Sequence, residues 1–412
     1  MRRAHRWAAV GLLLASSVLL ADREAAAQSV DQFGVQARAD AAKRMIVLAV
    51  QQGISSLPPT SGQSLTYVFD EADLTYVVSE RLGPTSFRSP QLMGPGRLSL
   101  RVAASYFDLA QTFQPIDYAI SGVGLPPDYC TRFGLAASAT VGLFNFAATY
   151  GLFDRIELNL NAPVVVTSVS GSEIFLALNP QSDMPSAVPC SQLPRAVSSG
   201  LLKVVKRNFS DIALPQGDVN FREGTSVGLG RISLGAKVAL YNGEQLQFAL
   251  MPEIYLPSPS EDEYAGSASG AFLARLVAQY VVMPVWRLHV DVGYDADFDL
   301  NELSGFTWNT GTSFAISGTY PWTVDFGVGG WQFNQGIEWT PSQASFAQFG
   351  GSTGQLRALG NNRLGSTFVD FLAGIKVRLT ERSVVSGAVN VPLNDEGFRA
   401  AAVGTIAVEY YF

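Results

Sequence analysis

Apolar and polar residues alternate with a period of two along most of this chain, and no other feature restricts the fold more strongly. In Arg155–Val166 every even-numbered residue is apolar, while Glu157, Asn159 and Asn161 stand between them. Because successive side chains of a strand point to opposite faces, the pattern is typical of strands with one apolar and one polar face. Such strands form either a soluble sandwich around an apolar core or a membrane barrel with its apolar face against lipid.

Composition helps to separate these two folds. The chain of 412 residues is 47% hydrophobic and only 15% charged, below the ~25% charge of an average soluble domain. After residue 27 no stretch is long and apolar enough for a transmembrane helix, since even Gly270–Val282 is short and contains Arg275. Only helices and closed barrels satisfy their backbone groups inside a membrane. We therefore predict an all-β fold, with a single transmembrane antiparallel β-barrel over residues 97–412.

The N-terminus has the pattern of a cleaved signal peptide over residues 1–27. Arg2, Arg3 and Arg6 precede an apolar run, and the small residues Ala25–Ala27 stand before the expected cleavage site. A single membrane anchor is the alternative, but the charged residues Asp22, Arg23 and Glu24 end the apolar run before it is long enough to span a bilayer. We expect an exported protein.

The C-terminus ends in a strand pattern, Val403–Phe412, whose last residue is aromatic. Ile406, Val408, Tyr410 and Phe412 share one face. This end resembles the C-terminal strand of bacterial outer-membrane β-barrels, which the barrel assembly machinery reads. The resemblance implies an outer-membrane location, with that machinery and outer-membrane lipid as partners.

Twelve alternating segments are present, and an even number returns both barrel ends to the periplasm. Short turns follow the even-numbered segments and long loops follow the odd-numbered ones, as in outer-membrane barrels. The pattern is weaker near residues 135, 269, 309 and 383. The segments begin near residues 97, 135, 154, 226, 245, 269, 286, 309, 323, 367, 383 and 400, with short turns at 151–153, 242–244, 283–285, 320–322 and 380–382 and long connections at 171–224, 258–268, 299–308 and 333–366.

Residues 28–96 precede the first strand and contain a helical pattern from Phe33 to Leu48, which ends at Gly53 and a following proline pair. Three positions are open for this helix. It plugs the lumen or lies at the periplasmic mouth, it binds a periplasmic partner, or the segment is a disordered extension.

The polar faces of the strands supply the candidate lumen-lining residues, and their charges are of both signs. Neighbouring opposite charges either pair and rigidify a narrow lumen, or they form a transverse field that orients a permeating solute. The candidates are Arg101, Arg155, Glu157, Arg231, Lys237, Glu253, Arg287, His289, Asp291, Asp325, Asp370, Lys376, Arg378 and Glu409.

The only two cysteines, Cys130 and Cys190, both lie in predicted extracellular loops. An exported protein meets an oxidising compartment, so we predict a disulfide between them. Two free thiols are the alternative.

Two motifs carry a family resemblance. Tyr150–Leu158 and Gly228–Lys237 resemble elements of outer-membrane proteins described as transporters of the "MetA pathway of phenol degradation" group. An aspartate usually stands in that group at the position of Arg231. The resemblance spans residues 95–412 and implies a channel of about twelve strands for small, often hydrophobic or aromatic compounds.

Catalytic and metal-binding patterns are weak in this sequence. His289, the only histidine after the signal peptide, is expected near a periplasmic turn as a hydrogen-bonded filler rather than a catalytic base. Asp295, Asp297 and Asp299 alternate as a strand enters a loop, which suits either calcium or a solvated acidic loop. We predict no catalytic residue and no metal, and gradient-driven diffusion needs no cofactor.

A net charge of −7 argues against a nucleic-acid partner. The leading expectation is therefore an outer-membrane channel for a small-molecule solute. The first alternative is a structural or adhesive surface protein that uses its long loops, and an enzyme within a barrel is the second.

Overall fold

The structure is a computed structural model of the chain. It describes residues 47–48, 50–51, 54, 65–70, 75–121, 129–177, 188–199, 201, 203–208, 224–258, 265–300, 302–335, 338–339, 344–347, 353–358, 362–363, 367–394, 396 and 399–412. The predicted signal peptide and most of the predicted helix lie outside these residues.

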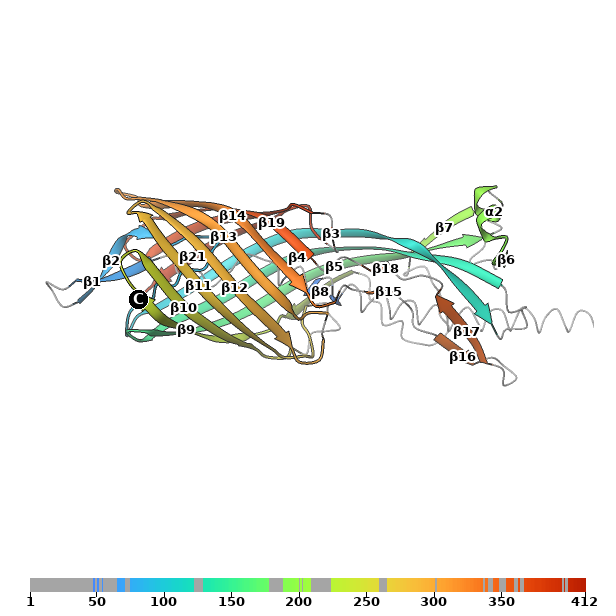
Figure 1. Cartoon of the computed structure of the whole chain (residues 1–412), viewed down its shortest axis with the longest axis horizontal. Helices are drawn as coiled ribbons and strands as arrows, with labels where there is room; N and C mark the ends of the chain where they lie inside the picture. The colour runs from blue at the N-terminus through green and yellow to red at the C-terminus, as the bar shows by residue number, and fades with distance from the viewer. Residues whose placement is uncertain are drawn as a thin grey trace, which may run out of the picture.

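Twelve antiparallel strands close into a barrel, which confirms the predicted fold class (Figure 1). The last strand, β21, pairs with β20 on one side and with β3 on the other, so that Glu409 stands opposite Arg101 and no edge is left open. The barrel strands are β3 (Leu98–Ser121), β4 (Tyr129–Phe153), β5 (Ile156–Ala177), β8 (Gly224–Leu229) continued by β9 (Ser233–Asn242), β10 (Leu246–Tyr255), β11 (Ala271–Met283), β12 (Trp286–Asp297), β13 (Gly305–Ile316), β14 (Trp322–Phe333), β19 (Thr367–Arg378), β20 (Ser383–Pro392) and β21 (Val403–Tyr411).

Side chains alternate between the outside and the inside of the barrel as the period of two predicts. Leu158 and Ile406 are 43% and 68% exposed on the outer face, whereas their neighbours Glu157 and Thr405 are 1% and 6% exposed. The outer face is thus apolar and suited to lipid, while the charged face is enclosed. Among the described residues, no helix is both long and apolar enough to cross a membrane.

One barrel strand is interrupted between β8 and β9, at residues 230–232. The amide of Gly230 donates to the carbonyl of Pro163 on β5 at 2.8 Å. A Cβ atom at position 230 would lie 2.8 Å from the Pro163 ring, so this crossing requires glycine. Proline lacks an N–H for the ladder, and the two pairings of β5, with β8 and with β9, lie on either side of it.

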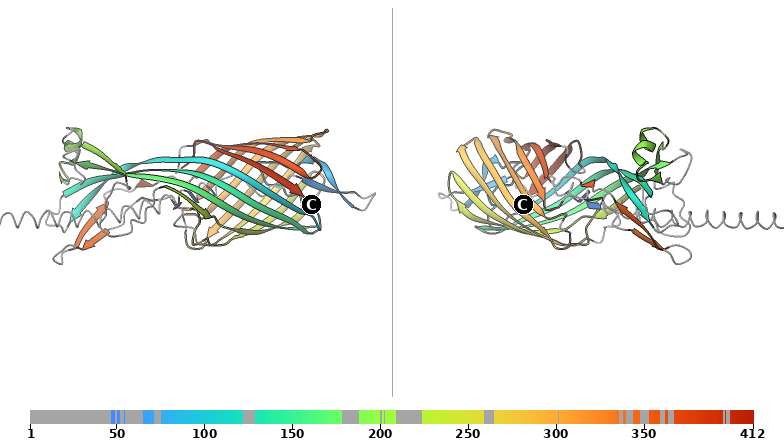
Figure 2. Two further views of the ribbon diagram at one scale, coloured as in Figure 1. Left: turned by 180° about the vertical axis from the view of Figure 1, so that it is seen from behind. Right: turned by 45° about the vertical axis from the view of Figure 1, so that its right-hand side comes forward.

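Strands β3, β4 and β5 are much longer than the others, with 24, 25 and 22 residues. About 9–11 residues suffice for a strand to cross a bilayer, so these strands project far beyond the barrel at the long-loop end (Figure 2). The predicted loop 171–224 therefore begins with seven strand residues. The projecting part also carries β6 (Val188–Pro189), α2 (Leu193–Ser198), β7 (Lys203–Asn208), β16 (Ala344–Ala347) and β17 (Thr353–Ala358), while β15 (Glu338–Trp339) pairs with β18 (Asn362–Arg363).

Cys190 is disulfide-bonded in this projecting part. Strand β6 ends just before it and pairs with β4 so that Val188 stands opposite Cys130. This pairing brings the two chain segments together, as the predicted bridge between Cys130 and Cys190 requires. The bridge remains a prediction, which thiol labelling of denatured, unreduced protein tests.

A small hairpin, β1 (Leu65–Asp70) and β2 (Thr75–Leu82), stands at the short-turn end of the barrel, near the C-terminus (Figure 1). Short turns mark the periplasmic side of outer-membrane barrels. The chain between β2 and β3 then enters the barrel, and this segment forms the centre of the site described next.

Candidate functional site: the lumen and its plug

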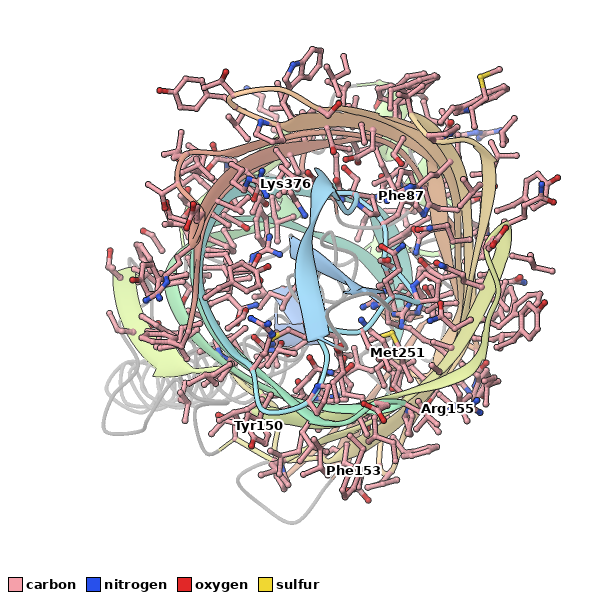
Figure 3. All side chains as sticks on the ribbon, turned by 90° about the vertical axis from the view of Figure 1, so that its left-hand side faces the viewer. Phe87, Tyr150, Phe153, Arg155, Met251 and Lys376 are labelled. Carbon is pink, nitrogen blue, oxygen red and sulfur yellow. The ribbon has the colours of Figure 1, made fainter. Side chains whose placement is uncertain are left out.

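Residues 83–97, here called the plug segment, lie inside the barrel (Figure 3). Viewed from the short-turn end, the ribbon that leads into β3 crosses the interior, and Phe87 and Lys376 lie within the ring of strands. Phe87 is 1% exposed and Met93 is fully buried. The plug segment contains three prolines and three glycines and has no alternating pattern. A plug was expected within residues 28–96, but that expectation rested on the helical pattern, and nothing in residues 83–97 themselves indicates that they fill the lumen.

The first half of the plug segment is held by β14 and β19. The carboxylate of Asp325 accepts the amide N–H groups of Thr85 and Ser86 at 2.7 and 2.8 Å. The ammonium group of Lys376 donates to the carbonyl oxygen of Pro84 at 2.7 Å. Both charged groups are fully buried, so these charge-assisted bonds replace their lost hydration. We call Asp325 and Lys376 the first plug contact.

The second half is held by β5 and β9. Glu157 and Lys237 form an ion pair of 2.8 Å. Lys237 also donates to the carbonyl oxygen of Gln91 at 3.1 Å, and Glu157 accepts the amide of Met93 at 3.2 Å. We call this pair the second plug contact. The hydrogen bonds from both contacts to the plug segment go to its main-chain atoms, so they place little restriction on which side chains the plug segment carries.

The plug segment leaves the lumen at the turn between β4 and β5. The amide of Gly96 donates to the carbonyl of Gly151 at 2.7 Å, and the amide of Gly151 donates to the carbonyl of Arg97 at 2.9 Å. A Cβ atom at position 151 would lie 1.7 Å from the carbonyl oxygen of Gly94. Gly151, part of the first family motif, is therefore required for the plug segment to pass.

A cavity remains beside the plug segment inside the barrel, with about 1150 Å³ of empty space, part of it continuous with solvent. Gln51, Ile54 and Arg88 contribute to its wall from the N-terminal part of the chain. Residues 47–48, 50–51 and 54 are helical, and all but Ile54 are buried. The barrel contributes apolar residues, among them Leu143, Met251 and Trp331, and polar residues, among them Asn145, Asn161, Glu253 and Tyr255.

A charged cluster stands at the polar end of this cavity. Arg275 of β11 donates to Asp291 of β12 at 3.2 Å and to Thr307 at 3.1 Å. Arg88 of the plug segment approaches the same carboxylate only to 4.0 Å. Arg88 is thus the weaker partner of Asp291. Of the two charged residues in the plug segment, Arg88 and Arg97, only Arg88 is among the residues that line the cavity.

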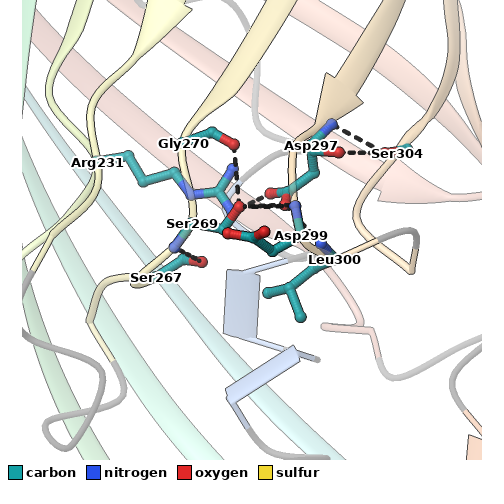
Figure 4. Close-up of polar contacts among 8 residues, drawn as sticks. All are labelled: Arg231, Ser267, Ser269, Gly270, Asp297, Asp299, Leu300 and Ser304. Atoms are coloured by element: carbon teal, nitrogen blue, oxygen red, sulfur yellow. Dashed lines mark hydrogen bonds and ion pairs between the residues drawn. The ribbon is translucent and has the colours of Figure 1, made fainter.

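The acidic run at the end of β12 serves to anchor a loop (Figure 4). Asp297 forms an ion pair with Arg231. Its other oxygen accepts the hydroxyl of Ser269 at 2.6 Å and the amide of Leu300 at 2.8 Å. Among the described residues, no group of three or more His, Cys, Asp or Glu side chains is arranged to hold a metal ion.

Most of the residues predicted to line the lumen have inward, enclosed positions. Arg155 does not, because it lies exposed in the turn before β5. The alternation that includes it continues past the end of the strand, and this explains the misplacement. The buried positions are Arg101, Glu157, Lys237, Arg287, His289, Asp291, Asp325, Asp370, Lys376 and Glu409, and the partly buried ones are Arg231, Glu253 and Arg378.

Several of these residues form ion pairs or hydrogen bonds. This agrees with the first alternative for the lumen charges, in which neighbouring opposite charges pair. Beyond the pairs above, Asp370 binds Arg399, whose guanidinium group lies over the ring of Phe368 at 4.5 Å. Glu409 accepts the hydroxyl groups of Ser99 and Tyr411 at 2.8 and 2.5 Å. Arg275, on a strand with weak alternation, and Arg399, in a loop, were not among the residues predicted from the sequence.

His289 is buried and its Nε2 atom lies 2.7 Å from the hydroxyl of Ser313. Its Nδ1 atom has no hydrogen-bond partner among the described residues. A catalytic triad needs a carboxylate at that second nitrogen to orient the ring. The arrangement fits the predicted hydrogen-bonded filler rather than a catalytic base.

Residues 201–399 match the family described as "Putative MetA-pathway of phenol degradation". The match includes the second motif, Gly228–Lys237, with its arginine at position 231, while the first motif lies outside it. This match confirms the resemblance to that group over residues 201–399, which are just under half of the chain.

Solved structures of outer-membrane channels are similar at low identity. An outer-membrane channel from Pseudomonas putida F1 is 11% identical over 78% of this chain and 97% of its own, with a TM-score of 0.43. The toluene transporter TodX of Pseudomonas putida is 11% identical over 77% and 89%, with a TM-score of 0.34. At such scores the shapes differ widely, so the fold rests on the strand pairing of this chain. No curated protein matches the sequence.

Proposed function

We propose that this protein is an outer-membrane channel that lets small molecules, including hydrophobic or aromatic ones, diffuse passively along their gradient. The cavity inside the barrel supports this most directly, because its wall holds both apolar side chains and many polar and charged ones, so a small molecule with an apolar body and a polar group finds partners there. The description of the family, which names phenol degradation, supports aromatic compounds as one solute class.

In this proposal the arrangement with the plug segment inside the barrel is the closed state of the channel. Passage through the lumen requires residues 83–97 to move. Each charge-assisted hydrogen bond that holds them contributes about 1.5–3 kcal/mol. A few such bonds keep the closed state dominant, yet the opening of one short segment does not require the barrel to unfold.

Solute flux into liposomes tests this proposal. The wild-type protein is compared with the double variant Asp325→Asn/Lys376→Met, which weakens the first plug contact. A matched control, Glu381→Gln/Arg382→Met, makes similar changes at two exposed positions of a short turn. We expect faster flux of small neutral solutes through the first variant and wild-type flux through the control. An absence of flux from all three, with folding verified by heat-modifiable gel migration, contradicts a channel.

A second candidate function is attachment at the cell surface, favoured by the projecting part of β3, β4 and β5. These strands extend beyond the barrel and bind further short strands there. Adhesion of whole cells that carry the protein, compared with cells that lack it, separates this function from transport. Adhesion without solute flux would favour the surface role.

The assembly machinery is the proposed partner of the C-terminal strand. Tyr410 and Phe412 are exposed on the outer face and their rings contact edge to face at 4.9 Å. Replacing both with serine removes the aromatic end and its interfacial anchoring. We expect a lower outer-membrane yield of this double variant, and a normal yield would contradict the partner.

A further inference from the structure

Phe87 is the one aromatic side chain of the plug segment, and the barrel wall has a shaped place for its ring. Three inward positions stand in a row across adjacent strands, with His289 of β12 opposite Gly311 of β13, and Gly311 opposite Gly327 of β14. The rings of Phe87 and His289 are parallel within 1°, with centroids 5.9 Å apart. We call these three wall positions the ring slot.

The two glycines create the slot. A Cβ atom at position 311 would lie 2.1 Å from the tip of the Phe87 ring, and one at position 327 would lie 2.7 Å from it. Glycine weakens a strand, and within strands it often marks a place where a ligand or another chain approaches closely. Two of them opposite each other leave an area without side chains, which the edge of an aromatic ring can approach while its face lies parallel to His289.

The chain links the slot to the cavity. Arg88, the neighbour of Phe87, contributes to the cavity wall, whereas Phe87 and the three slot positions are not among its lining residues. A solute therefore has to pass from the cavity beyond Arg88 to reach the slot. The hydrogen bonds of the two plug contacts go to main-chain atoms of the plug segment, and Phe87 is its one aromatic side chain, so an aromatic molecule can imitate Phe87.

We propose that the ring slot is a binding site for the aromatic ring of a solute, and that Phe87 occupies it when the lumen is closed. An aromatic solute competes with Phe87, and its binding releases the first half of the plug segment. This inference rests on the proposed channel function and names an aromatic solute class for it. A tethered group competes at an effective concentration of about millimolar, so the response requires solute near that range.

Hydrogen exchange on the folded full-length protein tests the competition, with phenol and cyclohexanol as probes. The two molecules share a hydroxyl group and ring size and differ in aromaticity. The amides of Thr85 and Ser86, which are bonded to Asp325, report the release of the plug segment. We expect phenol at millimolar concentration to speed their exchange at least threefold and cyclohexanol to leave it unchanged. Equal effects of both, or no effect of phenol, overturn the proposal.

Two variants provide a second test, in which thermal shift measures the affinity for phenol and hydrogen exchange measures the release of the plug segment. Phe87→Ala empties the slot, so phenol should bind it at least tenfold more tightly than the wild-type protein. Gly311→Ala fills the slot, so phenol should no longer affect the exchange of Thr85 and Ser86. Gly404→Ala is the matched control, because a Cβ atom there meets nothing within 4 Å. If Gly311→Ala does not fold, the Phe87→Ala comparison alone decides, and unchanged affinity for phenol overturns the slot.

The outcomes also separate this inference from the channel function. Solute flux without any effect of phenol on the plug amides contradicts the slot and leaves the channel standing. Tight binding of phenol to Phe87→Ala, with no flux through any variant, supports the slot and contradicts the channel.

Discussion

The two contacts that hold the plug segment are built from the same residue types, one carboxylate and one lysine, but they differ in what remains when the plug leaves. Glu157 and Lys237 bind each other at 2.8 Å as well as the plug. Asp325 and Lys376 each bind main-chain atoms of the plug segment. Departure of the plug thus leaves an ion pair intact at the second contact, whereas at the first it removes the main-chain partners of both charged groups.

This difference places the cost of opening at one side of the lumen. A buried charge that loses its partner is costly, whereas a buried pair that stays together is compensated. The second contact therefore belongs to the barrel and stabilises it whether the plug is in or out. The first contact belongs to the plug and favours the closed state.

The largest effect is expected from Lys237→Met. It leaves Glu157 buried without its cation, and breaking a buried pair in this way costs about 3–5 kcal/mol. Because the pair joins β5 to β9, we expect the loss in the stability of the barrel itself. Denaturant unfolding followed by gel mobility measures it. A loss confined to the plug segment, with an unchanged unfolding midpoint, would remove the distinction between the two contacts.

The next effect is expected from Asp325→Asn. The amide keeps the shape of the carboxylate but loses its charge, which weakens two bonds to the plug and leaves Lys376 without a nearby compensating anion in that contact. We expect the closed plug to lose about 2 kcal/mol, equal to roughly 30-fold faster hydrogen exchange at Thr85 and Ser86. The unfolding midpoint of the barrel should change much less. Slow exchange in the variant would contradict the role of Asp325.

The sequence was sufficient to identify the charged residues of both contacts as inward-facing. The period of two assigns Glu157, Lys237, Asp325 and Lys376 to the polar face, because lipid outside a barrel accepts only the other face. The same pattern misplaced Arg155, since alternation continues for a residue or two beyond the end of a strand. Period alone does not mark where a strand stops.

What these charges bind was not predictable from the sequence. The plug segment offers them main-chain atoms, which every residue has, so no complementary charge pattern appears in residues 83–97. The length of β3, β4 and β5 was hidden for a similar reason. Pairing between these strands continues beyond the barrel through main-chain atoms, although the alternation of apolar and polar residues is lost there, as in Leu109–Ser121.

A smaller effect is expected when both members of the second contact are removed. The double variant Glu157→Gln/Lys237→Met leaves no uncompensated charge, so the barrel should recover most of the stability that Lys237→Met loses. The coupling energy between the two positions then measures the pair directly. Only the exchange of the Met93 amide, which Glu157 accepts, should remain faster than in the wild-type protein. A double variant as unstable as the single one would contradict the pairing.

The smallest effect is expected from Arg155→Ala, two residues from Glu157 in the chain. Its side chain is exposed in the turn before β5, and a surface substitution away from specific contacts changes stability by no more than about 0.5 kcal/mol. Its main-chain carbonyl, which accepts the amide of Ala239, is kept in the variant. Unfolding midpoint, plug exchange and solute flux should therefore all match the wild-type protein. A change in flux would return Arg155 to the lumen, where the sequence pattern placed it. The electric field at the short-turn mouth would then act on the solute, in addition to the control that the two plug contacts exert.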